Sequence, residues 1–186
     1  MTIAANAIIS VAEAKDYIKL VGTSDDTKIE TIINGVSKAF ENYCGTNFIN
    51  GSISEIQNGD GSNSIILRNR PVVSFTSIAI RDNNPQSVSD YYIDLAAGII
   101  QAKYIAFPND FQNITIVYVQ GYGAAIANLP ADVKLAALKQ TEFFYKRDVA
   151  DFSDTFEEGM IIRAPSEFLI PAVKTMLDIY VVHKVY

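Results

Sequence analysis

Apolar residues near the start of the chain recur at the three- and four-residue spacing of amphipathic helices. Ser10 and Glu13 form a capping-box signature, which predicts a first helix over residues 11–20. A second helix is predicted from the caps and acids at residues 23–26 to Cys44, directly before a glycine. The apolar face of this second helix comprises Ile29, Ile32, Ile33, Val36, Ala39, Phe40 and Tyr43.

Between residues 51 and 122 the pattern changes to short β-branched and aromatic runs separated by turn residues, which indicates strands. Strands are predicted at residues 52–57, 64–68, 74–81, 91–95, 99–101 and 113–119. The first two flank the sequence Asn-Gly-Asp-Gly-Ser-Asn at residues 58–63, so a β-hairpin is predicted there. Residues 82–90 are polar and include Pro85, which predicts an exposed loop.

Helical spacing returns after residue 123. Pro130 suits the first position of a helix that continues to about Arg147, because proline needs no hydrogen-bond donor there. Residues 148–159 are predicted to form a loop. A last helix is predicted from Pro171 to near the C-terminus.

This order of elements predicts an α+β protein with a single domain over residues 1–186. A helical bundle is expected from residues 10–45 and 130–184, two helices from each segment. An antiparallel β insertion is expected at residues 51–122. A length of 186 residues suits one domain that carries an insertion and disfavours two independent domains.

Composition narrows the class of protein. Apolar residues make up 49% of the chain and charged residues 19%, an ordinary globular composition with an apolar surplus that partners can cover. No apolar run approaches the roughly 20 residues that cross a bilayer, and the first residues lack signal-peptide features, so a cytosolic protein is expected. The single cysteine, Cys44, excludes an internal disulfide and favours a buried, inert thiol.

The charge distribution bears on nucleic-acid binding. The net charge is −6, and the 15 basic residues are scattered among 21 acidic ones. A DNA-binding surface needs clustered Lys and Arg to neutralise phosphates. Tight binding of DNA is therefore disfavoured.

Motifs for catalysis or metal binding are weak. The only histidine, His183, lies close to the C-terminus, where a Ser/His/Asp triad is poorly supported. The loop at residues 58–63 lacks the distal Glu of an EF-hand and the Gly-Lys-Ser/Thr of a phosphate-binding loop. Acid pairs at residues 25–26 and 157–158 are explained by helix capping and by a solvated loop. We expect no cofactor, no metal and no enzymatic activity.

Residues 24–45 resemble the opening of the head-tail connector (adaptor) proteins of tailed bacteriophages. The shared features are an Asp-rich cap, paired aliphatics, a small-residue turn and an aromatic residue before a glycine. The resemblance continues through Leu67-Arg-Asn-Arg-Pro-Val72, Tyr92-Ile-Asp-Leu95, Ile114-Thr-Ile-Val-Tyr-Val119, Leu129-Pro-Ala-Asp-Val-Lys-Leu-Ala136 and Tyr145-Lys-Arg147. The chain resembles the longer members of that family, in which a β-rich segment separates the helix pairs.

The resemblance implies a virion structural protein that forms a ring of about twelve subunits on the portal, in the neck between head and tail. The implied partners are the portal protein, a downstream neck or tail-completion protein and further copies of the chain. DNA would pass through the ring without specific binding, and no membrane is involved. Assembly would take place in the host cytoplasm. The family has no active-site residues to carry over.

Two other functions remain open. A neck stopper or tail-completion protein would be similarly acidic and oligomeric. A small-molecule-binding or hydrolytic domain, with a pocket in the β insertion, would need convergent titratable groups, and a sequence with one histidine and one cysteine argues against it.

Two segments are candidate assembly surfaces. An acidic loop is predicted to face the channel or the next neck component, with a solvated loop as the alternative; its acids are Asp148, Asp151, Asp154, Glu157 and Glu158. A set on the last helix is predicted to dock on the portal or an adjacent subunit, with the chain's own core as the alternative; it comprises Ile179, Val182, Val185 and Tyr186. The tail could instead dock as an added strand, because residues 179–182 are β-prone. Because the helix at 130–147 is apolar on more than one face, the isolated chain is expected to be monomeric or weakly associated and to form its ring only on a portal template.

Overall fold

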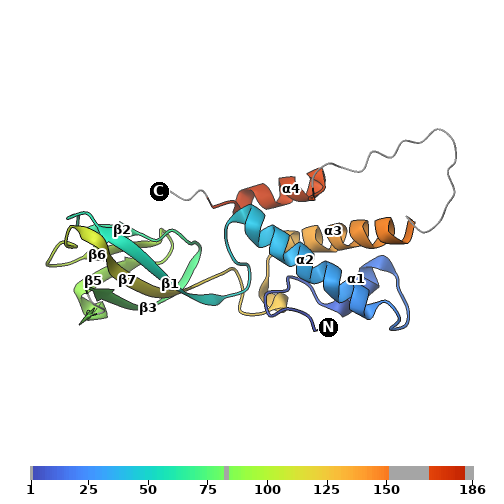
Figure 1. Ribbon diagram of the computed structural model, residues 1–186, viewed down its shortest axis with the longest axis horizontal. Helices are drawn as coiled ribbons and strands as arrows, with labels where there is room; N and C mark the ends of the chain where they lie inside the picture. Colours follow the sequence, from blue (N-terminus) through green and yellow to red (C-terminus); the bar gives the residue numbers. More distant parts are fainter. Residues whose placement is uncertain (1, 82–83, 151–167, 183–186) are drawn as a thin grey trace. The chain divides into compact units, whose positions relative to one another are not determined.

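The computed structural model describes residues 2–81, 84–150 and 168–182. The chain divides into two compact units, one made by Met1–Gly45 with Ala125–Val181 and the other by Thr46–Ala124 with Val182–Tyr186. The first unit is helical and the second is built from strands, as the labels in Figure 1 show. The predicted α+β class, with an antiparallel β insertion between helical segments, is confirmed.

The described part of the helical unit holds four α-helices. They are α1 (Val11–Ile18), α2 (Asp26–Cys44), α3 (Ala131–Ala150) and α4 (Pro171–Leu177). Single 3-10 turns, η2 (Ile126–Asn128) and η3 (Asp178–Tyr180), precede α3 and follow α4. Helix α3 packs against each of the other three helices (Figure 1).

The ends of the first two helices follow from local capping. The predicted capping box is present, because the Ser10 side chain accepts from the backbone of Glu13 and the Glu13 carboxylate accepts from the backbone of Ser10. Helix α1 ends earlier than predicted, because Lys19 adopts a left-handed φ of 65° and donates its backbone N–H to the last turn. Helix α2 ends as predicted, with Gly45 at a φ of 68°.

The buried face of α2 agrees in part with the predicted one. Ile29, Ile33, Val36 and Phe40 are fully buried. Polar Ser37 and Glu41 also lie on this face, together with Cys44. The Ser37 hydroxyl accepts the backbone N–H of Ile8 at 3.1 Å, which fastens the buried N-terminal segment to α2. From α3 and α4 the core receives Val133, Ala136, Ala137, Val173 and Leu177.

The β unit is a pair of antiparallel sheets. Its strands are β1 (Gly51–Gly59), β2 (Ser64–Ile66), β3 (Val72–Ile80), β4 (Asn84–Pro85), β5 (Tyr91–Asp94), β6 (Ile99–Ala102) and β7 (Asp110–Gln120). One sheet has the order β1-β7-β3-β4 and the other the order β2-β6-β5. Side chains from both sheets form one apolar core: Ile65, Leu67, Val72, Ile78, Tyr91, Ile100, Ala102, Phe107, Ile114, Ile116 and Tyr118.

The predicted hairpin around residues 58–63 is wrong. β1 pairs with β7 and β2 pairs with β6, so the loop connects two different sheets. Its glycines serve two purposes. Gly61 has a φ of +85°, whereas a Cβ on Gly59 would lie 1.9 Å from the carbonyl oxygen of Pro108. Close approach of the loop before β7 therefore requires a glycine at position 59.

The predicted loop at residues 82–90 also needs correction, because part of it is regular. β4 pairs with the end of β3, Ala79 with Pro85 and Ile80 with Asn84. A 3-10 turn, η1 (Val88–Asp90), follows. Proline is tolerated in β4 because this strand lies at the edge of its sheet.

Candidate functional site

The acidic candidate segment begins within a helix. α3 continues to Ala150, so Asp148 belongs to its last turn and not to the predicted loop. The Asp148 carboxylate lies 3.6 Å from the Lys28 ammonium on α2, and both side chains are substantially exposed. Such a surface pair contributes little stability. The other four acids, Asp151, Asp154, Glu157 and Glu158, lie outside the described residues.

The apolar C-terminal candidates do not lie on one long helix. α4 stops at Leu177, and the backbone turns through η3 into an extended conformation at Val181, so the prediction of a helix to near the C-terminus is wrong. Consecutive β-branched residues after Tyr180 favour this extended backbone. Ile179 is 76% exposed, whereas Val182 is half-buried. Val185, Tyr186 and His183 lie outside the described residues.

Tyrosine-carboxylate hydrogen bonds join the helices of the helical unit. Tyr43 on α2 donates to Asp178 at 2.5 Å, and Tyr145 on α3 donates to Asp25 at 2.6 Å. The hydrogen bond to the carboxylate raises the pKa of each of these two tyrosines. Asp25 is therefore occupied by a contact between helices, and it forms no side-chain cap on α2. Sequence patterns did not indicate these pairs.

A buried amide fixes the chain before α4. Gln140 on α3 is fully buried, donates to the carbonyl of Phe168 at 2.9 Å and accepts the backbone N–H of Ile170 at 3.1 Å. Both polar ends of one side chain thus hold residues 168–170 against α3. A glutamine among the apolar positions Val133, Ala136 and Ala137 was the available sequence signal for this contact.

The β unit contains a buried polar network. Tyr118 on β7 donates to Glu55 on β1 at 2.5 Å, and Glu55 also accepts from the Gln57 amide and from the backbone of Arg68. The Tyr118 oxygen accepts from Asn69. Burial and the bond to Glu55 raise the pKa of Tyr118 well above its ordinary value. The network ties residues 68–69 to the sheet.

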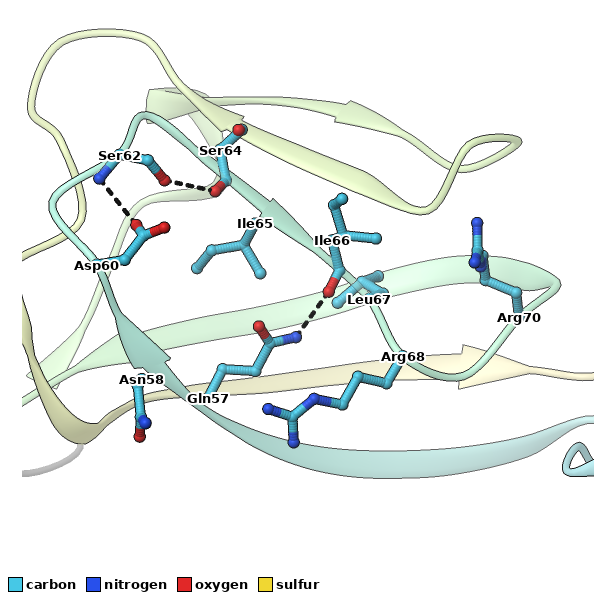
Figure 2. Close-up of a pocket in the computed structure, with 10 residues that line it drawn as sticks. All are labelled: Gln57, Asn58, Asp60, Ser62, Ser64, Ile65, Ile66, Leu67, Arg68 and Arg70. Carbon is cyan, nitrogen blue, oxygen red and sulfur yellow. Dashed lines mark hydrogen bonds between the residues drawn. The ribbon is translucent and has the colours of Figure 1, made fainter. Parts of the chain in front are cut away.

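A cavity of about 460 Å³ opens beside this network, between β1, β2 and the loop that joins them (Figure 2). It is lined by Gln57, Asn58, Asp60, Ser62, Ser64, Ile65, Ile66, Leu67, Arg68 and Arg70. Gln57 crosses it to donate to the carbonyl of Ile66 at 2.8 Å (Figure 2). Asp60 is hydrogen-bonded by Ser62, which lowers the pKa of this carboxyl. The lining thus offers one ionised acid and two arginines, which is not an acid-base pair for hydrolysis.

Within residues 2–81, 84–150 and 168–182, no group of three or more His, Cys, Asp and Glu residues could hold a metal ion. Cys44 is buried, as predicted, and burial raises its pKa to about 12. Over the same residues, no helix is both long and apolar enough to cross a membrane.

Comparison with known proteins places this fold in a structural class. The chain matches the family model "head completion protein" over residues 7–182. Its fold is similar to that of a chain in the neck of an empty gene transfer agent particle computed with C6 symmetry, with a TM-score of 0.69 and 18% identity, covering 100% of this chain and 95% of that chain. No curated protein matches the sequence.

Two further solved structures agree. A chain of a native gene transfer agent virion gives a TM-score of 0.68 with 18% identity, and one from a native neck computed with C12 symmetry gives 0.66 with 17% identity. Each match covers 100% of this chain and 95% of the other chain. The fold is thus shared with these chains of gene transfer agent particles. The chain belongs to the head completion protein family, which confirms the resemblance to phage head-tail connectors.

Proposed function

We propose that the chain is a non-enzymatic structural protein of the virion neck, which assembles as a ring of about twelve copies on the portal and joins head to tail. The observation that carries this proposal is the family match over residues 7–182. Support comes from a fold that aligns over the whole chain with neck chains from particles computed with C6 and C12 symmetry. The two units together act as one connector domain. Assembly takes place in the host cytoplasm.

The charge of the chain suits a DNA conduit. A wall that bound phosphates would have to break each contact as the genome moved past it. Each copy carries a net charge of −6, so a ring of copies repels the DNA backbone and lets it pass without specific binding. The partners are then the portal, a downstream neck or tail-completion protein and neighbouring copies.

Two surfaces carry the contacts in this proposal. The segment with Asp148, Asp151, Asp154, Glu157 and Glu158 faces the channel or the next neck component. Its described flanks are firmly placed, since α3 ends at Ala150 and Gln140 holds Phe168. The C-terminal set, Ile179, Val182, Val185 and Tyr186, docks on the portal or an adjacent subunit. The 76% exposure of Ile179 supports this role.

The test combines the purified chain with the portal of the same phage and images the mixture by negative stain. We expect an additional ring at the narrow end of the portal. A chain that stays monomeric and never sediments with portal rings contradicts the proposal. A ring that binds only beneath an existing connector, and not the portal itself, would instead identify a neck stopper or tail-completion protein.

Two variants test the two proposed contact surfaces separately. Replacing the five acids by Asn and Gln is expected to weaken neck assembly or slow genome passage. Full infectivity of this variant would instead support the alternative that the segment is a solvated loop. Deletion of residues 181–186 is expected to abolish portal binding without lowering the melting temperature. A soluble truncation that binds portal normally would contradict the docking role.

A further inference from the structure

The outer edge of β1 is the long free edge of the β unit. In the part of the chain that the structure describes, β1 is the end strand of its sheet, and it runs for nine residues. The strands at the other edges, β2, β4 and β5, are two to four residues long, and β4 contains Pro85. Natural proteins shorten, charge or cover such edges, because a free edge offers backbone groups to any extended chain. The edge of β1 is therefore a candidate acceptor for an added strand.

Backbone hydrogen bonds at the two ends of β7 show which residues bond in which direction. Asn113 on β7 accepts the backbone N–H of Arg81 at 2.7 Å, and Gly121, directly after β7, donates to the carbonyl of Pro71 at 3.2 Å. Both contacts lie on the β3 side of β7. Because neighbouring residues of a strand bond in opposite directions, the odd-numbered residues of β7 bond towards β3 and the even-numbered residues bond towards β1.

The register carries this alternation into β1. Ile116 lies opposite Glu55 and Tyr118 lies opposite Ile53, so the odd-numbered residues of β1 bond with β7. The residues that direct their N–H and C=O groups to the free edge are Ser52, Ser54 and Ile56, all exposed and uncharged. Glu55, the one charged residue of β1, is buried, and its carboxylate accepts from Tyr118 and Gln57. The edge thus offers backbone groups with no charged side chain beside them.

The cavity between β1 and β2 lies beside the same edge. Its lining residues come from β1, β2, the loop between them and residues 67–70, so it opens on the side of β1 away from β7 (Figure 2). In an added strand, alternate side chains point towards the interior of the sandwich, over this cavity. The apolar part of the lining is Ile65, Ile66 and Leu67. The site therefore combines free backbone groups with room for alternate side chains, the arrangement by which sheet edges recognise extended peptides.

The chain itself contains a segment of matching form. η3 ends at Tyr180, and Val181 is extended, with a φ of −67° and a ψ of 118°. The six residues from Val181 to Tyr186 include three valines and a tyrosine, which favour strands. In an extended conformation they span about 20 Å, at about 3.4 Å per residue. This length is sufficient to pair with the whole stretch from Ser52 to Ile56.

We propose that the outer edge of β1 takes residues 181–186 of the adjacent copy as an added strand. This inference rests on the ring and on the C-terminal docking proposed above, and it names the site on the adjacent subunit. Each copy then carries one donor segment and one acceptor edge. Such a head-to-tail contact closes into a ring when the rotation between copies is constant.

A photoreactive residue tests the contact in rings of the full chain. Benzoylphenylalanine replaces Val182, and the rings formed on the portal are irradiated. We expect covalent oligomers of the chain, with attachment sites that mass spectrometry maps to residues 52–58 or to the cavity lining. The same group in place of Val21, which is 99% exposed on the helical unit, should give no product at these residues. Products with the portal, or within a single copy, would overturn the inference and leave the proposed function intact.

Ser54→Pro blocks the edge without breaking the native sheet. Because the N–H of Ser54 points away from β7, proline removes a donor from the free edge and none from the pairing with β7. Ring formation on the portal should fall by about tenfold or more at an unchanged melting temperature. The control Ser54→Thr should form rings normally. Normal rings with Ser54→Pro overturn the inference, whereas a wild-type chain that forms no ring overturns the proposed function as well.

Peptides give a readout that does not depend on how a variant folds. A synthetic peptide of residues 178–186 is expected to inhibit ring formation by the wild-type chain. Only alternate N–H groups of an added strand bond to β1. Of two peptides N-methylated on the odd- or on the even-numbered residues from 181 to 186, one should therefore lose its inhibition and the other should keep it. No inhibition by the unmodified peptide, or equal inhibition by the two methylated peptides, contradicts strand addition.

Discussion

The hydroxyl of Tyr180 lies 2.8 Å from each carboxylate oxygen of Asp132, which joins the turn after α4 to the first turn of α3. The chain leaves helical geometry at this contact, since Val181 is extended. The Tyr180–Asp132 contact thus fixes the point at which the backbone leaves the helical bundle after η3.

Tyr180→Phe is expected to lower the free energy of unfolding of the helical unit by about 1 kcal/mol, because a half-buried hydrogen bond to a carboxylate is lost. The melting temperature, followed by circular dichroism at 222 nm, should fall by about 2–4 °C. Tyr104→Phe is the matched control, since Tyr104 is 81% exposed. Equal melting temperatures for the two variants would show that the Asp132 contact contributes nothing.

Glu13→Gln should destabilise the helical unit in a pH-dependent way. Burial alone would raise the pKa of Glu13, but hydrogen bonds from Lys134 and Ser10 outweigh it, and the pKa is lowered. The stabilisation is therefore fully present above the ordinary pKa of a glutamate and is lost as the pH falls through the lowered value.

Urea unfolding of Glu13→Gln and wild type is expected to differ by on the order of 1 kcal/mol at pH 7, the usual effect of a lost helix cap. The difference should shrink towards zero in acid. Asp16→Asn is the control, because the Asp16 side chain is 89% exposed. A difference that stays constant from neutral to acid pH would refute the assigned role of the ionised carboxylate.

Tyr118 should stay protonated in the folded protein at the pH where an ordinary tyrosine ionises. Its raised pKa means that the unfolded chain ionises first as the pH rises above about 10. The stabilisation is present below the unfolded pKa and is lost as the pH rises through the folded one. Absorbance at 295 nm should give the same folded-state titration between about pH 9 and 11 for wild type and Tyr118→Phe.

The same Tyr118→Phe variant should lower the stability of the β unit by about 2–3 kcal/mol, because Glu55 loses a donor while its carboxylate stays buried. A titration step in the pH 9 to 11 range that disappears in the variant would show that Tyr118 is accessible in the native protein.

Replacing each of two glycines by alanine should change the free energy of unfolding in opposite directions. A Cβ on Gly35 in α2 meets no atom within 4 Å, so Gly35→Ala is expected to stabilise the helical unit by about 0.5–1 kcal/mol. A Cβ on Gly59 meets Pro108 backbone, so Gly59→Ala should destabilise the β unit by more than this. Thermal melts of both variants give the comparison. A neutral Gly59→Ala would mean that the loop before β7 shifts freely.

Local chemistry made much of the fold predictable. The capping box at Ser10 and the glycine after α2 act within one helical turn, so residues a few positions apart suffice to place these helix ends. The strands were located to within a few residues for the same reason, since alternating β-branched positions mark them without reference to a partner. The acids at residues 148–158 and the apolar residues after Tyr180 were likewise visible in the sequence alone.

Only the tertiary structure decided which strand pairs with which and which polar groups meet. β1 pairs with β7, about 60 residues away, instead of with β2 across the four-residue connection 60–63. β1 and β2 belong to different sheets, which share one apolar interior. Gln140, Tyr145 and Tyr180 find their partners only after distant segments dock. Such contacts depend on the spatial position of a group, whereas a sequence pattern records its neighbours along the chain.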